Sequence, residues 1–119
     1  MRGLALLLVL GASAAGAAPP PGRYEATLCV STSAAKPASC GAAEFELRPN
    51  GRAQIRVADV VYRLHLRSAQ VDVMTMQGTM EIDEFSALYE WQGEMLTFVD
   101  ADKNVRYEVK PGAKVRARR

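Results

Sequence analysis

The residue types best suited to binding a metal ion lie in one short segment, where Met74 and Met76 are separated by a single residue. Soft thioethers suit a soft ion such as Cu(I), and Met-x-Met spacing is typical of exported proteins that handle copper. His65, the single histidine of the chain, is a candidate third ligand. The same methionines would also fill irregular gaps in a barrel core or rim. The sequence therefore leaves open a copper site at Met74, Met76 and His65 or a purely structural role.

Groups that could perform catalysis are few. One histidine cannot build a His-rich zinc site, and neither a G-x-S-x-G motif nor a Gly-rich phosphate loop is present. Paired carboxylates would need burial to shift their pKa values towards catalysis. The sequence therefore predicts a protein that is not an enzyme, although several carboxylates lie close together in sequence: Glu81, Asp83, Glu84, Glu90 and Glu94.

Charge is divided unevenly along the chain. Residues 23–67 hold seven basic and four acidic residues, residues 68–108 hold two basic and nine acidic residues, and residues 110–119 add five basic residues. These charges are either the solvated outer faces of strands or a surface that meets a charged protein partner, because such fields steer encounter. The basic stripe formed by Arg52, Arg56, Arg63, His65 and Arg67 lacks interleaved aromatic residues, so we expect no nucleic-acid partner. The candidate partner-binding residues are Arg56, Arg63, Arg67 and Glu90.

Two cysteines, Cys29 and Cys40, are positioned to staple a small domain. A redox pair usually has C-x-x-C spacing, whereas ten residues separate these two. An oxidising compartment favours a structural disulfide over free thiols. Such a bond would tie the first predicted strand to the second.

The elements that carry these residues are short strands. Apolar and polar residues alternate on both sides of Pro49-Asn50-Gly51 in the segment 43–57, which predicts an antiparallel hairpin. The same alternation recurs, and no sustained helical period is present, although 83–89 could form a short helical turn. The sequence predicts an all-β fold: a small antiparallel meander of about eight strands that closes into a β-barrel or β-clam, with an open β-sandwich as the alternative. Up to nine strands are predicted: 23–30, 43–48, 52–57, 59–67, 70–76, 79–83, 86–91, 94–99 and 105–109.

The two ends of the chain have different compositions from its centre. Residues 1–17 have a positive start, a short apolar run and an A-x-A site, which predicts a cleaved secretory signal peptide. Residues 18–22 are Pro-rich and should form a mobile arm. The barrel domain is predicted at 23–110, and residues 111–119 are predicted to be a disordered basic tail. We therefore expect a periplasmic or secreted monomer without a membrane span.

The segment Tyr89–Phe98, followed by Tyr107, resembles the closing hairpins of small periplasmic lipocalin-like barrels. Together with the leader, the 45–57 hairpin and the cysteines, the chain is similar to the c-type lysozyme inhibitor family. That resemblance implies an eight-stranded barrel that plugs a lysozyme cleft. The chain departs from the family in its two early cysteines, because the family's bridge reaches the last strand, and in Gln92-Gly93, where the family has a Lys-Gly pair. No inhibitory residue is carried over.

These observations together predict a non-enzymatic exported binding protein. Its partner would be a protein of the envelope or of a host, and its role that of an inhibitor or an envelope-stress accessory. The alternative is a periplasmic protein that handles Cu(I), with copper as its cofactor.

Overall fold

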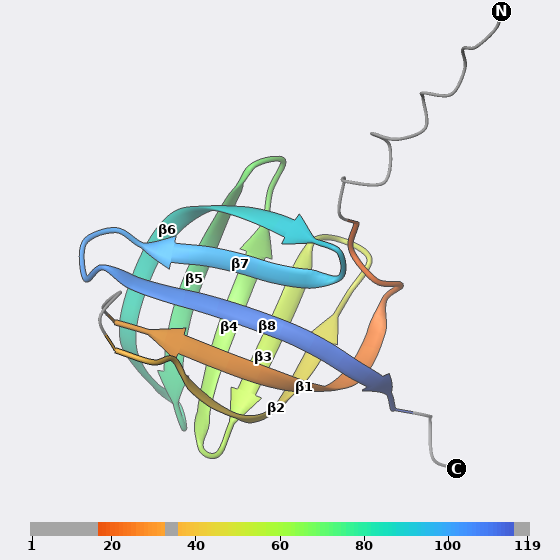
Figure 1. Cartoon of the computed structure of the whole chain (residues 1–119), viewed down its shortest axis with the longest axis horizontal. Helices are drawn as coiled ribbons and strands as arrows, with labels where there is room; N and C mark the ends of the chain where they lie inside the picture. The colour runs from red at the N-terminus through yellow and green to blue at the C-terminus, as the bar shows by residue number, and fades with distance from the viewer. Residues whose placement is uncertain (1–16, 33–35, 116–119) are drawn as a thin grey trace, which may run out of the picture.

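A computed structural model describes residues 17–32 and 36–115 of the 119-residue chain. Each strand pairs with its neighbours in sequence, and the last strand pairs with the first to close a barrel. The predicted all-β barrel is confirmed, and the alternative of an open sandwich is wrong because β1 and β8 are hydrogen-bonded. Figure 1 shows the strands β1 (Gly22–Ser31), β2 (Ser39–Leu47), β3 (Arg52–Val57), β4 (Val60–Leu66), β5 (Gln70–Gln77), β6 (Met80–Gln92), β7 (Met95–Asp100) and β8 (Val105–Lys114).

The β2–β3 hairpin forms where the sequence predicts it. Phe45 lies opposite Ile55, and both side chains are fully buried. The turn depends on Gly51, which has a φ of +83°. A Cβ atom at this glycine would lie 2.6 Å from the carbonyl oxygen of Leu66. Glycine is therefore required here both by the backbone conformation and by the close approach of β4.

The core lies inside the barrel and is built from alternate residues of the strands. Aromatic rings fill its centre: Phe98 stacks on Tyr107 with ring centroids 5.0 Å apart, and Phe85 and Tyr62 contact the other sides of Tyr107. The alternation recognised in the sequence thus separates core from surface. The buried apolar side chains are Tyr24, Leu28, Phe45, Leu47, Ala53, Ile55, Leu64, Val71, Val73, Leu96, Phe98, Tyr107 and Val109.

A disulfide joins the two strands of the first hairpin, β1 and β2. Cys29 and Cys40 face each other directly across β1 and β2, and they form a disulfide with their Cα atoms 4.0 Å apart. The predicted pairing is confirmed. Cys40 belongs to β2 and not to the loop, so the disulfide is a rung of the β1–β2 ladder.

The sequence prediction was wrong about residues 79–91, in the acidic part of the chain. Two strands and a possible helical turn at 83–89 were expected, but one continuous strand, β6, covers this region. The reason is that Asp83, Phe85, Ala87, Tyr89 and Trp91 keep an unbroken period of two and all face inwards. An extra residue at a bulge opposite Thr75 and Met76 starts this phase.

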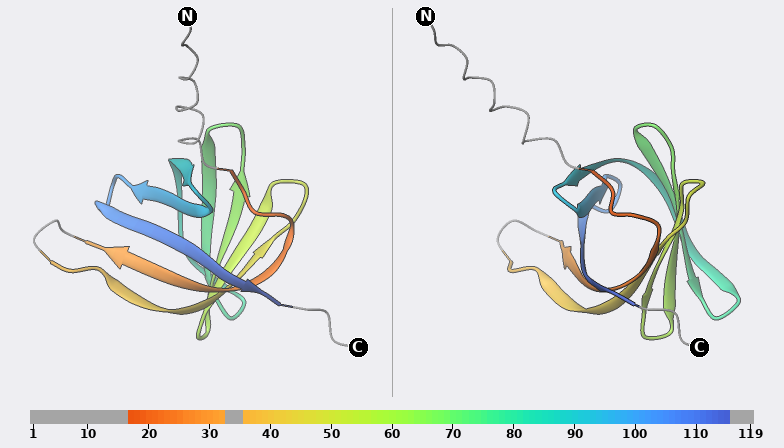
Figure 2. Two further views of the ribbon diagram at one scale, coloured as in Figure 1. Left: turned by 45° about the vertical axis from the view of Figure 1, so that its right-hand side comes forward. Right: turned by 90° about the vertical axis from the view of Figure 1, so that its right-hand side faces the viewer.

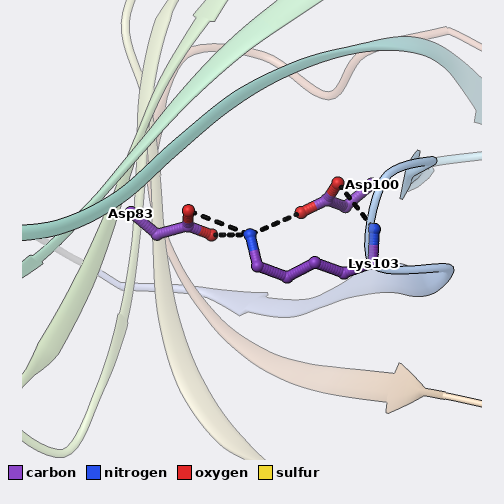
Figure 3. Close-up of polar contacts among 3 residues, drawn as sticks. All are labelled: Asp83, Asp100 and Lys103. Atoms are coloured by element: carbon purple, nitrogen blue, oxygen red, sulfur yellow. Dashed lines mark hydrogen bonds and ion pairs between the residues drawn. The ribbon is translucent and has the colours of Figure 1, made fainter.

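The barrel is split between the first half of β6 and the end of β7. Only Tyr89–Gln92 of β6 pair with β7, and Figure 2 shows the β5–β6 hairpin splayed away from the rest of the barrel. Lys103, in the β7–β8 turn, bridges the split. Its Nζ lies 2.9 Å from Asp83 Oδ2 and 3.4 Å from Asp100 Oδ2 (Figure 3). The hydrogen bond from Lys103 lowers the pKa of Asp83, and the same contact raises the pKa of Lys103.

The ends of the domain differ from the predicted boundaries. The Pro-rich arm packs on the barrel: the Ala17 N–H donates to the Gly93 carbonyl, and the Tyr24 hydroxyl donates to the Pro20 carbonyl. Pro19 between them is buried, and Figure 1 shows the arm passing from the β6–β7 turn to β1. The expectation of a mobile arm at 18–22 is therefore corrected, because the burial of Pro19 and the hydrogen bond to the Pro20 carbonyl fix the segment.

The predicted tail also begins too early, because β8 continues to Lys114, which pairs with Tyr24. Pro111, which suggested the end of the strand, lies opposite Ala26 beside a shift in register, where a missing N–H is tolerated. Residues 111–114 are therefore strand. All but the last residue of the predicted signal peptide at 1–17, and the rest of the predicted tail at 116–119, lie outside the described residues.

Candidate functional site

A groove of about 570 Å³ lies on the outer face of β3, β4 and β5. The buried core residues Ala53, Leu64 and Val73 are among the residues that line it. Outward side chains form its walls. One row across the strands consists of Arg52, His65 and Asp72. The next row consists of Gln54, Arg63, Met74 and Glu84. Arg48 and Arg67 lie at the turns.

Four arginines give the groove its charge, and they differ in their partners. The Arg67 Nε lies 2.8 Å from Asp72 Oδ2, and the Arg48 Nε lies 3.3 Å from Glu46 Oε2. Within residues 17–32 and 36–115, Arg52 and Arg63 have no carboxylate at ion-pair distance. Both are exposed on neighbouring strands. The groove thus offers two free guanidinium groups to an anion.

Asp72, which lines the groove, is held in place by several hydrogen bonds. Its carboxylate accepts hydrogen bonds from Arg67 Nε at 2.8 Å, Ser86 Oγ at 2.8 Å and Gln70 Nε2 at 3.1 Å. These donors, Arg67 first, lower the pKa of Asp72 from 3.8 to about 2. Asp72 therefore links the β4–β5 turn, β5 and β6, and it orients Arg67 at the rim of the groove.

Acidification should remove the stabilising contribution of the Asp72 carboxylate. The folded-state pKa of Asp72 is about 2 and its unperturbed value is 3.8. The ionised carboxylate therefore stabilises the fold above about pH 4, and this contribution is lost as the pH falls towards about 2. We expect the thermal midpoint of Asp72→Asn to fall less than that of the unmodified protein across this interval. Glu81→Gln, at an exposed position on β6, is the control and should follow the unmodified protein; equal slopes for all three would contradict the prediction.

The candidate copper ligands Met74, Met76 and His65 lie on the outer face of the sheet, but they do not form a compact cluster. Met74 and Met76 are half-buried on the outer face of β5, as expected from the burial of Val71 and Val73. His65 and Met74 both line the groove, but Met74 lies directly opposite Arg63, and Met76 lies two pairs further along, opposite Val61. Among the residues that the structure describes, no group of three His, Cys, Asp or Glu side chains is arranged to hold a metal. The copper site stays a prediction.

The candidate partner-binding residues are divided between two surfaces. Arg63 and Arg67 line the groove, whereas Arg56 lies beyond it, 3.9 Å from Glu44. Glu90 is on the outer face of β6 opposite Thr97 and is not among the residues that line the groove. The predicted set omitted Arg48, Arg52 and Asp72, which complete the groove. Arg52 could have been found, because it continues the outward alternation of β3 on which Arg56 lies.

The carboxylates considered for catalysis are separated by the pleat of β6. Asp83 faces inwards and binds Lys103, while Glu84 and Glu90 face outwards and Glu81 is exposed. Glu94 is exposed in the β6–β7 turn. These positions do not assemble the five carboxylates into one buried site.

Comparisons with protein-family models, curated protein sequences and solved structures find no match for this chain. In the part of the chain that the structure describes, no helix is both long and apolar enough to cross a membrane. Function must therefore be inferred from the groove and the surfaces of the barrel.

Proposed function

We propose that this protein is an exported, non-enzymatic binding protein whose basic groove recognises an acidic surface of a protein partner. The observation that carries the proposal is that Arg52 and Arg63, at a concave site, have no carboxylate partner among residues 17–32 and 36–115. The A-x-A leader pattern and the disulfide support a periplasmic or extracellular location. In that location the partner is an envelope or host protein, and the role is that of an inhibitor or envelope-stress accessory.

The groove has the chemistry that carboxylate recognition requires. A guanidinium group presents a planar fork of donors that can bind a carboxylate through two parallel hydrogen bonds. Arg67 is already held by Asp72, so the rim is ordered before a partner arrives and less side-chain entropy is lost. The surrounding positive field accelerates encounter and makes binding sensitive to salt.

A photo-crosslinking experiment tests the proposal without knowledge of the partner. A photoreactive amino acid at Gln54, inside the groove, should capture a protein partner when the chain is exported with its own leader. The same amino acid at Thr27, on the outer face of β1, is the control position. Equal capture from both positions, or capture that persists in about 1 M salt, would contradict recognition by the groove.

Removal of the free arginines should weaken the captured complex. Arg52→Ala with Arg63→Ala should raise the Kd by about 10–100-fold, because each charge-assisted hydrogen bond contributes roughly 1.5–3 kcal/mol and part of this is screened at an exposed site. The matched control is Arg23→Ala with Arg106→Ala, which removes two cations already paired with Glu44 and Glu108. Isothermal titration calorimetry with the identified partner measures both variants. An unchanged Kd in the first variant would refute the proposal.

The inhibitor role has its own test against a c-type lysozyme. The purified protein should slow the lysis of cell-wall suspensions by the enzyme, and the Arg52→Ala, Arg63→Ala variant should not. Full lysozyme activity in the presence of excess protein would remove the inhibitor role and leave the envelope accessory.

A second candidate function is Cu(I) handling, favoured by the shared groove position of His65 and Met74. The two residues are diagonal neighbours on β4 and β5, a separation of about 7–8 Å between Cα atoms that long side chains can span. Met74→Ile with Met76→Ile should then abolish competition with a chromogenic Cu(I) chelator. Met95→Ile, on β7, is the control, and an unchanged Cu(I) affinity in the double variant would remove this candidate.

A further inference from the structure

The first half of β6 has a free edge. Residues Met80–Leu88 pair with β5, but no strand in the described part of the chain pairs with their other side, because β7 pairs only with Tyr89–Gln92. Val99 and Asp100, which could have continued the ladder, pair with β8 alone. We call this unpaired side of Met80–Leu88 the β6 edge. Such an edge is a template for an added strand.

The direction of the backbone shows which residues would bind that strand. The Tyr89 N–H donates to the Ala69 carbonyl on the β5 side, at 3.2 Å. Backbone groups alternate in direction along an antiparallel strand, so the N–H and C=O groups of Leu88, Ser86 and Glu84 point to the open side. The side chains of the same three residues face solvent. The edge is therefore accessible through both its backbone and its outer face.

The chemistry around the edge selects a basic strand. Glu81 and Glu84 are exposed and form no ion pair within the described residues. Apolar side chains are also exposed on this strand: Met80 is 66% exposed, Ile82 48% and Leu88 76%. Pairing of two β6 edges would place glutamates of both copies together, which is unfavourable across a ladder. A strand that alternates basic and apolar residues avoids this repulsion.

The chain itself contains a segment with this pattern. After Pro111 and Gly112, the sequence alternates Lys114, Val115, Arg116, Ala117 and Arg118. In extended form, the three basic side chains share one face, while valine and alanine share the other. Val115 is already 37% exposed beyond the end of β8. This segment is complementary to the β6 edge in charge and in alternation.

The strand order favours a strand that comes from another molecule. In the up-and-down order, β8 ends at the opposite end of the barrel from the β5–β6 turn, and Figure 1 shows these two points on opposite sides. The five residues after Lys114 can span at most about 18 Å. We propose that the β6 edge of one copy receives residues 116–119 of a second copy as an added β-strand, with Arg116 and Arg118 facing Glu84 and Glu81, while Lys114 and Val115 stay bonded to β1 of their own barrel.

Charge exchange tests the contact in the full-length protein. Sedimentation velocity should show concentration-dependent association in about 0.1 M salt and monomers in about 1 M salt. Arg116→Glu with Arg118→Glu should be monomeric, as should Glu81→Lys with Glu84→Lys. A chain that carries all four changes should associate again. A monomer for the unmodified chain, or failure of the fourfold variant to regain association, would overturn the proposal; circular dichroism confirms that each variant is folded.

A peptide distinguishes strand addition from simple charge attraction. Residues 113–119 as a synthetic peptide should bind the full-length Arg116→Glu, Arg118→Glu variant, whose β6 edge is free. Methylation of alternate backbone nitrogens keeps every charge but removes the ladder hydrogen bonds, and it should weaken binding at least tenfold. Equal binding of the two peptides, measured by fluorescence anisotropy, would show that no strand is formed and would refute the proposal.

Discussion

Phe98→Ala is expected to lower the free energy of unfolding by about 3–5 kcal/mol, the usual cost of emptying a buried aromatic site. Phe98 is 2% exposed and stacks on Tyr107 with ring centroids 5.0 Å apart. The centroid of its ring lies 6.2 Å from that of Phe85. Phe98 therefore packs the splayed β6 against the β7–β8 hairpin. The loss includes transfer of the ring to water, a cavity that rigid strands cannot close, and the aromatic contacts themselves.

Chemical denaturation followed by Trp91 fluorescence measures the effect. A domain of this size has a total stability of roughly 5–15 kcal/mol, so the variant should unfold at a much lower denaturant concentration. Leu88→Ala is the matched control, because Leu88 is 76% exposed in the same barrel and its truncation should change stability by less than about 0.5 kcal/mol. A loss below about 1 kcal/mol for Phe98→Ala would contradict the packing described above.

Loss of the disulfide is expected to cost about 3 kcal/mol. The bond joins residues 11 positions apart, and the chain-entropy model assigns about this value to a loop of roughly a dozen residues. Replacement of both cysteines by serine should be tolerated sterically, since Cys40 is exposed and Cys29 only half-buried. The main effect then comes from the additional freedom of the unfolded chain.

Three samples separate this effect from the substitutions themselves. The oxidised protein should be more stable to urea than the reduced protein by about 3 kcal/mol, and Cys29→Ser with Cys40→Ser should match the reduced protein. Reductant should have no effect on the double variant. If reduced and oxidised proteins unfold at the same urea concentration, the β1–β2 ladder alone determines the local stability.

The division of charge along the sequence becomes two surfaces in the barrel. The basic surface is the groove over β3–β5, where Arg52 and Arg63 lack carboxylate partners in the described structure. The acidic surface includes the β6 edge with Glu81 and Glu84. Glu84 also lines the groove, so the two surfaces adjoin. Binding at each surface can be measured in the same protein. The Arg52→Ala, Arg63→Ala variant leaves β6 intact, and its state of association reports on the edge alone.

The amino-acid sequence by itself determined the all-β class, the 45–57 hairpin and the identity of most core positions. These are local properties: alternation assigns each side chain to one face of its strand, and Asn50-Gly51 provides the conformations that the turn requires. The cysteine pairing was also determined, because two cysteines in one domain permit a single bond. The outward orientation of Arg63, His65 and Met74 follows from the same alternation.

Only the tertiary structure decided how those faces meet. The groove depends on the register that places Arg52 beside His65 and Arg63 beside Met74, and register between strands is not written in the alternation of either strand. The split at β6 depends on where β7 stops pairing, which in turn depends on the bending of a 13-residue strand. The contact of Lys103 with Asp83, 20 positions away in sequence, exists because the closed barrel brings the β7–β8 turn back to β6. Sequence thus fixes which residues face outwards, while closure and bending of the sheet decide which of them become neighbours.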